Sequence, residues 1–366
     1  MQVKLPITDS CDFAILGHQE RWENVYAMVN QMRGSQTNQV VEEEIRYIFP
    51  FFPARSLFKI DVTSTLNNKK ITGCYVETFI GPDSLVSIHL KENIQKVKEA
   101  AFCANTLGAP IATLGGFTSI VLEGQTKLLP AGLQTVFTTG NTLTAAFIVQ
   151  NVKDACQVLD KDISQSHIIV IGATGDIGSA CVNYFAGKSA QLTLVARNKR
   201  KLFESYHDLS GTACTITDSV EEYASEGDII IAAASSSSIQ LHNLKTGTLV
   251  IDAGYPKNID ITCIDTSKIH FLYGGMGYVC GNIHFYPDYR LPLYHVPSRK
   301  IAHGCILEAV VLAFENKHYA YSQGRGQITL EKMEEILLWA NKHGIIPAPF
   351  YNHQGLWSIQ KYTYGE

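Results

Sequence analysis

The spacing of apolar residues changes along the chain, and from residue 167 onward it is typical of an α/β domain. Short apolar runs alternate there with helical stretches, in the order HIIVIG (167–172), QLTLVAR (191–197), DIIIAAA (228–234), TLVIDAG (248–254) and HFLYGG (270–275). Continuous apolar strands separated by helices are typical of a parallel sheet that helices cover on both faces. This region is therefore predicted to be a Rossmann-type domain.

The N-terminal part mixes strand and helix patterns. The aromatic and β-branched stretch 45–64 predicts short strands and bends, and GCYVETFI (73–80) predicts another strand. Residues 91–107 place apolar side chains on one helical face, and IATLGGFTSIVL (111–122) predicts two strands around a glycine turn. This part is expected to be an α+β domain.

The C-terminal part becomes helical again, in GCILEAVVLAFE (304–315) and ITLEKMEEILLWANKHG (328–344), and the tail 351–366 shows no clear period. The predicted fold is α/β, with a central Rossmann-type parallel sheet domain flanked by an α+β N-terminal domain and C-terminal helices. The expected domains are 1–140, the α+β part; 141–295, which contains the Rossmann-type sheet; and 296–366, the C-terminal helical segment.

Composition narrows the class of protein. The 366 residues are 46% hydrophobic and 17% charged with a net charge of −4, which excludes a disordered chain and does not indicate a nucleic-acid binder. The nine cysteines show no CxxC spacing, so we expect neither a disulfide framework nor a metal site. With no apolar run of membrane length and no signal-peptide pattern, the expected location is cytoplasmic.

The strongest local motif is the glycine-rich turn in HIIVIGATGDIGSACVNYF (167–185). A strand ends at Gly172, a helix begins near Asp176, and glycines recur with G-x-x-G-x-x-G spacing. Such a turn lets the backbone approach a pyrophosphate, which the helix N-terminus then attracts. The alternative is a tight turn without a ligand. The predicted dinucleotide contacts are Gly172, Ala173, Thr174, Gly175, Asp176, Ile177 and Gly178.

The next strand indicates which dinucleotide is bound. An NAD site has an acid about 20 residues after the turn, to hold the ribose hydroxyl groups. The strand here ends in LVARNKR (194–200), which contains no acid. The guanidinium groups of Arg197 and Arg200, with Asn198 between them, suit the 2′-phosphate of NADPH. The alternative is that these cations form a solvated helix start.

Ten stretches run collinearly along the chain: ILGH (15–18), GCYVET (73–78), LGGFTSIV (114–121), FTTGNTLTA (137–145), GATGDIGSA (172–180), ARN (196–198), GYPKN (254–258), VPSR (296–299), CILEA (305–309) and GRGQI (324–328). In these stretches the chain resembles cyanobacterial-type long-chain acyl-(acyl-carrier-protein) reductases. The glycine motif alone fits many reductases, whereas LGGFTSIV and FTTGNT before it, with a cysteine helix after VPSR, are more specific.

The resemblance implies the NADPH-dependent reduction of a fatty acyl thioester, acyl-ACP or acyl-CoA, to an aldehyde through a cysteine acyl-enzyme. Cys305, with Glu308 three residues on, matches the family's cysteine, and Glu308 is either structural or a proton-transfer group. The resemblance implies that residues 1–140 and 296–366 together form the acyl site, while 141–295 bind NADPH. This chain departs from the family by one extra residue before the thiol and by Gly304. The implied partners are an acyl-carrier protein and an aldehyde-deformylating oxygenase of hydrocarbon biosynthesis.

Without the resemblance, Cys305 would be interpreted as a core residue, because free cysteine is among the most buried residue types. Thioester chemistry requires a nucleophile that takes the acyl group before hydride arrives. A thiol in a first helical turn is expected to have a lowered pKa. His303 is either a helper of this thiol or a surface imidazole, and the turn LGGFTS, near Ser119, either supplies oxyanion donors or simply connects two strands.

Two other functions fit parts of the pattern. One is an NADP-dependent dehydrogenase acting on a small polar substrate, in the style of shikimate or methylene-tetrahydrofolate dehydrogenases, for which Cys305 would be dispensable. The other is a non-catalytic module that senses NADPH, which would bind the cofactor without turnover.

Overall fold

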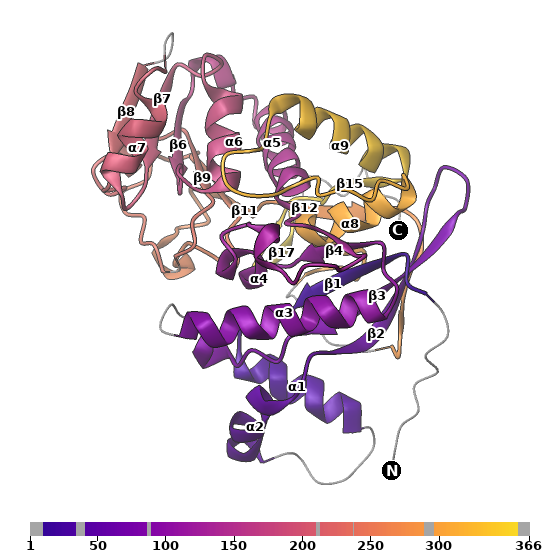
Figure 1. The fold of residues 1–366 in the computed structure, drawn as a ribbon. Coiled ribbons are helices and arrows are strands. Elements are labelled where there is room, and N and C mark those ends of the chain that lie inside the picture. Colours follow the sequence, from indigo (N-terminus) through magenta and orange to yellow (C-terminus); the bar gives the residue numbers. More distant parts are fainter. Residues whose placement is uncertain are drawn as a thin grey trace.

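The computed structural model describes residues 10–33, 41–85, 89–209, 213–236, 238–288 and 296–357. In these ranges the chain builds two six-stranded sheets, with long helices between and around them (Figure 1). The first and last residues, which the expectations about a signal peptide and an aperiodic tail partly concern, lie outside the described ranges.

The first sheet is mixed and has the strand order β13-β2-β3-β1-β4-β5. Its strands are β1 (Phe13–Gly17), β2 (Arg55–Thr63), β3 (Lys70–Glu77), β4 (Ile111–Leu114), β5 (Val136–Thr138) and β13 (Ile283–Tyr286). β1 pairs in parallel with β3 and β4, while β2 runs antiparallel to β3 and β13. All five residues of β1 are buried because α3 (Leu90–Thr106) and α8 (Gly304–Phe314) cover opposite faces of the sheet.

The second sheet is wholly parallel and has the order β11-β10-β9-β6-β7-β8. Its strands are β6 (His167–Ile171), β7 (Gln191–Val195), β8 (Ala213–Thr217), β9 (Ile229–Ala232), β10 (Leu249–Asp252) and β11 (His270–Tyr273), with helices α6 (Asp176–Phe185) and α7 (Lys199–Tyr206). This order is that of a dinucleotide-binding sheet, so the predicted Rossmann-type domain is confirmed.

The helix α5 (Asn141–Val158) connects the two halves. It packs against α6 on one side and against α8 and α9 (Leu330–Lys342) on the other, as Figure 1 shows. Most of its residues are buried because it has protein on nearly every side. A three-stranded sheet of β14 (Ile301–His303), β12 (Met276–Val279) and β15 (Ile345–Pro347) lies beside it.

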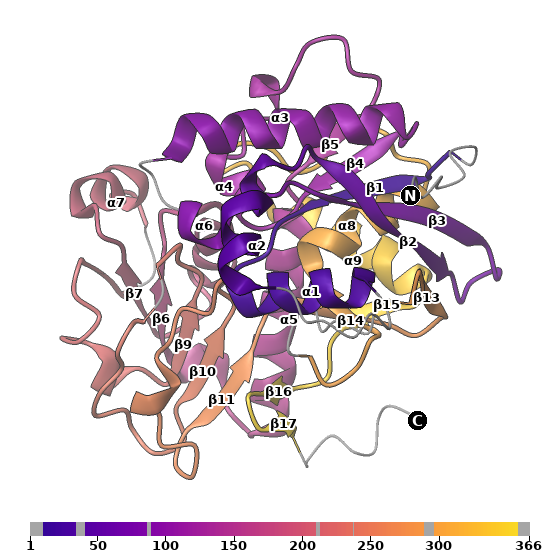
Figure 2. The same cartoon turned by 90° about the horizontal axis from the view of Figure 1, so that it is seen from below.

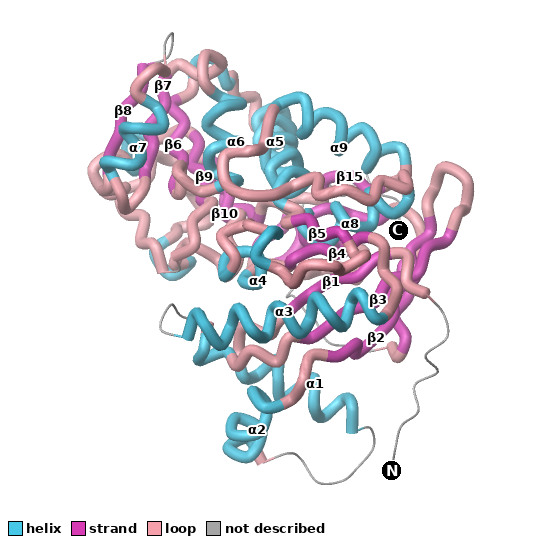
Figure 3. The backbone as a smooth tube through the Cα atoms, viewed as in Figure 1, coloured by secondary structure: helices cyan, strands magenta, loops and turns pink. Residues whose placement is uncertain are grey.

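The structure differs from the sequence expectations in several elements. Residues after Gly116 form the helix α4 (Phe117–Val121) instead of a second strand, and part of the aromatic stretch forms α2 (Glu42–Ile48), next to α1 (Trp22–Arg33) in Figure 3. The aperiodic tail contains a hairpin of β16 (Tyr351–Asn352) and β17 (Gly355–Leu356) beside β11 (Figure 2). Short apolar runs fit strand and helix equally well, so packing decides between them.

A disulfide joins Cys11 and Cys74, whose Cα atoms are 6.2 Å apart, although no disulfide was expected. The parallel pairing of β1 with β3 places Ala14 opposite Cys74, and this register brings the segment before β1 close enough for the bond. Cysteine spacing along the sequence does not contain that information. The division into domains at residues 140 and 295 stays a prediction, and β13 from the middle region completes the first sheet.

No helix within the described ranges is both long and apolar enough to cross a membrane.

The carboxylate of Glu308 connects α8 to β5, to α5 and to the loop that contains Ser322. Its fully buried carboxylate accepts hydrogen bonds from the Thr138 hydroxyl (2.5 Å), the Leu143 backbone N–H (3.0 Å) and the Ser322 hydroxyl (2.9 Å). The bond to Leu143 satisfies an N–H in the first turn of α5. Glu308 therefore has the structural role that was one of the two alternatives for it.

We expect Glu308→Ala to lower the free energy of unfolding by roughly 2–5 kcal/mol, because it leaves several buried donors without an acceptor. Denaturant unfolding followed by circular dichroism measures this. Glu334→Ala on the exposed face of α9 is the matched control and should change the value by less than about 0.5 kcal/mol. Equal effects of the two changes would show that the bonds of Glu308 contribute little.

Candidate active site

The three glycines of the turn after β6 have different surroundings. A Cβ on Gly172 would lie 2.5 Å from the Ala233 carbonyl oxygen, and one on Gly178 would lie 2.2 Å from the carbonyl oxygen of Gly172. These two positions are closed by the protein's own backbone. The nearest atom to a Cβ on Gly175 is 3.1 Å away, so there is more room there, at the N-terminal end of α6. The turn thus fits a cofactor diphosphate.

The side chain of Asp176 faces protein. Its carboxylate accepts hydrogen bonds from the Asn141 side-chain amide (2.9 Å) and from the Gly326 backbone N–H (3.0 Å), and burial raises its pKa. Asp176 therefore joins the start of α6 to the start of α5 and to the loop that contains the GRGQI motif. Of the turn residues predicted to bind the cofactor, Asp176 is the one whose side chain is engaged in this way.

The three residues after β7 that were predicted to bind the 2′-phosphate make different contacts. Nη2 of Arg197 lies 3.4 Å from the hydroxyl of Ser235, which follows β9. Because β6 lies between β7 and β9, the Arg197 side chain passes over the carboxyl end of β6, next to the glycine-rich turn. Asn198 caps α7 by accepting the Lys201 N–H, and Arg200 pairs on the surface with Glu204 at 2.9 Å.

Cys305 is the second residue of α8, as expected from the position of Gly304. Its carbonyl oxygen accepts a 2.7 Å hydrogen bond from the Thr113 hydroxyl at the end of β4. A Cβ on Gly140, which has φ = +75°, would lie 2.2 Å from the Cα atom of Cys305. Only glycine fits there, so the N-terminal ends of α5 and α8 are in direct contact.

The expectation of a lowered thiol pKa is wrong. Burial raises the pKa of Cys305 to about 11, although backbone N–H groups of Gly116, Ile306 and Cys305 itself favour the thiolate. The charge of Glu308 acts in the same direction as burial. Desolvation by the surrounding protein exceeds the helix-start effect, although part of the residue stays accessible to solvent. Cys305 therefore carries a thiol, and forming the thiolate requires a base.

The turn LGGFTS lies at the thiol. The Gly116 N–H that points at the Cys305 sulfur comes from this turn, and Gly116 has φ = +53°. The Phe117 N–H donates to Nε2 of His18 at 3.0 Å. Ser119 is buried within α4. The turn thus places a backbone donor beside the sulfur.

His303 precedes α8 and is partly buried. Its ring packs edge to face on Tyr255, with centroids 4.8 Å apart. Burial, together with the charge of Lys257, lowers its pKa to about 3, so the ring is neutral. The contact with Tyr255 shows that the ring is not freely exposed, and a role of His303 in helping the thiol stays a prediction.

Four polar residues that the sequence analysis did not single out lie near the thiol. His18 and Glu20 follow β1, and Tyr255 and Lys257 follow β10. Burial lowers the pKa of His18 to about 4 and raises that of Glu20 to about 7. His18 lies in the motif ILGH, and Tyr255 and Lys257 lie in GYPKN. Polar residues at the carboxyl ends of strands are the signal that could have identified them.

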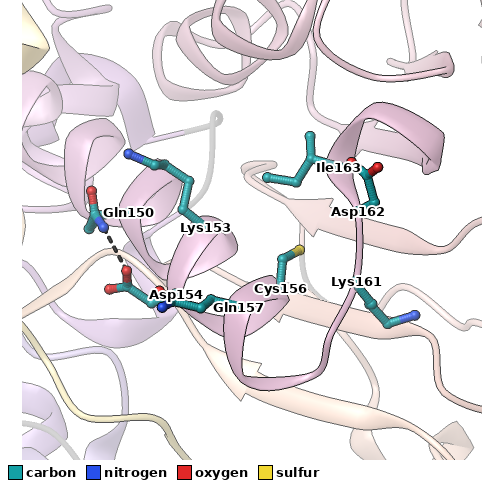
Figure 4. A pocket seen from close by; sticks show the side chains of 8 residues that line it. All are labelled: Gln150, Lys153, Asp154, Cys156, Gln157, Lys161, Asp162 and Ile163. Carbon is teal, nitrogen blue, oxygen red and sulfur yellow. Dashed lines mark hydrogen bonds between the residues drawn. The ribbon is translucent and has the colours of Figure 1, made fainter.

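A separate surface hollow lies at the far end of α5, as Figure 4 shows. It is lined by Gln150, Lys153, Asp154, Cys156, Gln157, Lys161, Asp162 and Ile163. The Gln150 amide donates to Asp154 at 2.6 Å, and burial raises the pKa of Cys156 to about 11. Because Cys305 contacts the opposite end of α5, at Gly140, this hollow is not part of the thiol site. Within the described ranges, no cluster of His, Cys, Asp and Glu is arranged to hold a metal ion.

The chain is similar to several known proteins. The Shikimate / quinate 5-dehydrogenase family model matches residues 153–272, which include most of the parallel sheet. The aminotransferase PigE from a Serratia strain is 27% identical over 67% of this chain and 29% of its own length. The solved structure of L-tryptophan dehydrogenase from Nostoc punctiforme is 11% identical, with a TM-score of 0.36 over 92% of this chain and 80% of that one.

The long-chain acyl-[acyl-carrier-protein] reductase of Synechococcus elongatus is 35% identical over 309 residues, which are 81% of this chain and 88% of the relative. The aligned length is too great for the cofactor domain alone to account for it. By this match, the chain belongs to the long-chain acyl-[acyl-carrier-protein] reductase family and is an NADPH-dependent oxidoreductase.

Proposed function

We propose that this enzyme reduces a long-chain fatty acyl thioester to the fatty aldehyde, with acyl-carrier protein as the acyl donor and acyl-CoA as an alternative donor. The similarity to the Synechococcus reductase supports this substrate class. The observation that carries the mechanism is the position of Cys305, a thiol at a helix start with the Gly116 N–H directed at its sulfur.

Cys305 is the acyl nucleophile in this proposal. Its sulfur attacks the thioester carbon, the carrier's sulfur leaves with the bonding pair, and the acyl group becomes a thioester of the enzyme. The N–H of Gly116 and those of the first turn of α8 are the donors nearest to the oxygen that gains charge. NADPH supplies a hydride to the acyl carbon, the bond to sulfur breaks, and aldehyde leaves.

The cofactor is proposed to lie with its diphosphate on the turn 172–178 and its 2′-phosphate at Arg197. The room at Gly175 and the position of Arg197 across the end of β6 support this placement. Asn198 contributes as the cap that fixes the start of α7, and Arg200 contributes positive charge from the surface.

The proposed partners and the cellular location do not come from the geometry of the site. An aldehyde-deformylating oxygenase as the acceptor of the product rests on the family resemblance alone. The cytoplasmic location stays a prediction, and the Cys11–Cys74 disulfide does not favour it, because disulfides are rare in a reducing compartment.

One other function has an observation in its favour. The family model that matches residues 153–272 describes dehydrogenases of small polar substrates. That match covers the cofactor-binding sheet and not Cys305, so it is equally compatible with the acyl reductase. The two functions differ in whether the thiol is needed.

Cys305→Ser is expected to reduce aldehyde formation by about three orders of magnitude or more, because a hydroxyl is far less ionised than a thiol and an ester is a poorer hydride acceptor. Intact-protein mass spectrometry with an acyl thioester alone should show acylated native enzyme and no acylated variant. Cys181→Ser, at a buried position on α6, is the control and should still be acylated. Near-native aldehyde formation by Cys305→Ser would favour the small-substrate dehydrogenase.

Arg197→Met is expected to weaken NADPH binding about 10- to 100-fold, which corresponds to the loss of one charge-assisted hydrogen bond of ~1.5–3 kcal/mol. NADH binding should change little, because NADH lacks the 2′-phosphate. Arg200→Met, at a side chain paired with Glu204 on the surface, should weaken NADPH binding far less. Fluorescence titration measures the affinities, and equal losses for both cofactors would remove Arg197 from the 2′-phosphate site.

Gly175→Val is expected to abolish NADPH binding without unfolding the protein, because Gly175 has φ = −76° and its Cβ, 3.1 Å from the Gly172 carbonyl oxygen, would require only a small shift of the backbone while the side chain would meet the diphosphate. Gly178→Ala should instead lower the free energy of unfolding by about 1–3 kcal/mol, since its Cβ would meet the Gly172 carbonyl oxygen. Cofactor titration and thermal melts separate the two effects. NADPH binding that survives Gly175→Val would mean that the turn does not hold the diphosphate.

A further inference from the structure

The proposed reaction moves protons that Cys305 cannot supply by itself. The thiol must lose a proton before attack, and each turnover takes up one proton when aldehyde and free thiol are formed. We propose that Glu20 is the proton reservoir of the Cys305 site, and that the Tyr255 hydroxyl passes protons between the Glu20 carboxyl group and that site. This inference rests on the proposed function.

Tyr255 lies next to the residue that contacts the sulfur. A Cβ on Gly116 would lie 2.7 Å from the Tyr255 ring and 3.2 Å from Nε2 of His18, while the N–H of Gly116 faces the Cys305 sulfur. The same tyrosine ring packs on His303, which immediately precedes α8. The Tyr255 ring therefore lies against both Gly116 and His303, two residues that are next to the thiol.

Glu20 is hydrogen-bonded to Tyr255, and its other carboxyl oxygen can accept a further hydrogen bond. One carboxyl oxygen shares a hydrogen bond with the Tyr255 hydroxyl, and Oε1 is buried with no hydrogen-bond partner in the described part of the chain. A buried carboxyl oxygen without a partner is costly and calls for an explanation. Burial raises the pKa of Glu20 to about 7 even though Lys257, Arg21 and Tyr255, the charged and titratable groups that act on it, all lower it.

The turn after β10 fixes Tyr255 and Lys257 in place. The buried carboxylate of Asp252 accepts the backbone N–H groups of Gly254, Asn258 and Ile259 at 2.9–3.1 Å. Nζ of Lys257 lies 3.3 Å from the Asp252 carbonyl oxygen, and burial lowers its pKa. Because Asp252 fixes the backbone of this turn, the amino group of Lys257 lies close to Glu20.

The two histidines near the thiol are poorer candidates for this role. Their pKa values of about 4 for His18 and about 3 for His303 keep both rings neutral at ordinary pH. Nε2 of His18 already accepts the Phe117 N–H and is not available as a base. A group whose pKa lies near the working pH is present in both its acid and its base form, which suits a proton carrier.

The steps balance as follows. During acylation, the proton of Cys305 passes through Tyr255 to the Glu20 carboxylate and then to the leaving thiolate of the carrier, so Glu20 is a carboxylate again. A proton from solvent then converts Glu20 to the carboxylic acid. During reduction, hydride adds to the acyl carbon, the oxygen takes the negative charge, and the C=O bond re-forms as the bond to sulfur breaks. The departing sulfur of Cys305 takes the proton of the Glu20 carboxylic acid as that bond breaks, which returns Glu20 to the carboxylate for the next acylation.

The two half-reactions therefore have opposite pH dependence. Acylation needs the carboxylate, so its rate should rise with pH through about 7, and reduction needs the carboxylic acid, so its rate should fall through the same value. Acylation is followed by mass spectrometry with palmitoyl-coenzyme A alone. Reduction is followed as single-turnover NADPH oxidation after acyl-enzyme has been formed.

Glu20→Gln should slow reduction by about 10²-fold and make its rate independent of pH between about pH 6 and pH 8. Tyr255→Phe should do the same, because it removes the hydroxyl and keeps the ring on Gly116. Glu23→Gln, at an exposed glutamate of α1, is the matched control and should keep the native rate and pH profile. Glu20→Asp retains a carboxyl group and should restore a pH-dependent rate with a shifted midpoint.

The outcomes separate this inference from the proposed function. If the native chain is acylated at Cys305 and reduced, but Glu20→Gln keeps the native rate and pH profile, the proton reservoir is wrong and the acyl-enzyme stands. If the native chain is not acylated at all, the proposed function itself fails. Thermal melts and NADPH titration establish that each variant is folded, and should Glu20→Gln be unfolded, a pH profile for Glu20→Asp identical to the native one overturns the inference.

Discussion

The close contact between the N-terminal ends of α5 and α8 is the constraint on which the site depends. At Gly140 a single methyl group would overlap the backbone of Cys305, so the two helix starts can meet only at a glycine. The buried carboxylate of Glu308 then joins the same helices by accepting the Leu143 N–H. Because α5 also packs against α6, and the Asp176 carboxylate accepts the Asn141 amide, the thiol is positioned relative to the cofactor domain by contacts between helix starts. The chemistry therefore depends on how closely the backbone packs around Cys305.

Much of this architecture is encoded locally, and the sequence predicted that part well. The parallel sheet was predictable because each of its buried strands is a continuous apolar run, and the glycine motif was predictable because its spacing reflects backbone geometry. The helix α4 was missed because residues 117–121 are a short apolar run that fits either period. The direction of the Cys305 pKa shift was also missed, since the helix-start effect is local and the desolvation that exceeds it comes from segments distant in sequence.

The polar residues around the thiol could not be predicted either, because their partners are distant in sequence. Glu20 follows a strand of the first sheet and Tyr255 follows a strand of the second, so 235 positions of sequence separate the partners of one hydrogen bond. Each is an ordinary loop residue when taken alone. Only the docking of the two sheets, carboxyl end towards carboxyl end, gives them a common environment in which a carboxyl group titrates near neutrality. Sequence analysis can identify such strand ends, but it cannot pair them.

The return of β13 to the first sheet has a consequence for the mobility of the enzyme. The chain leaves that sheet after β5, builds the cofactor domain, and re-enters the sheet beside β2. The nucleotide-binding region is thus an insertion that two chain segments connect to the first sheet, whereas a domain at one end of a chain is connected by a single linker. Two connections restrict the rigid-body motion of this region to rotation about the line that joins them, and the packing of α5 against α6, α8 and α9 opposes that rotation.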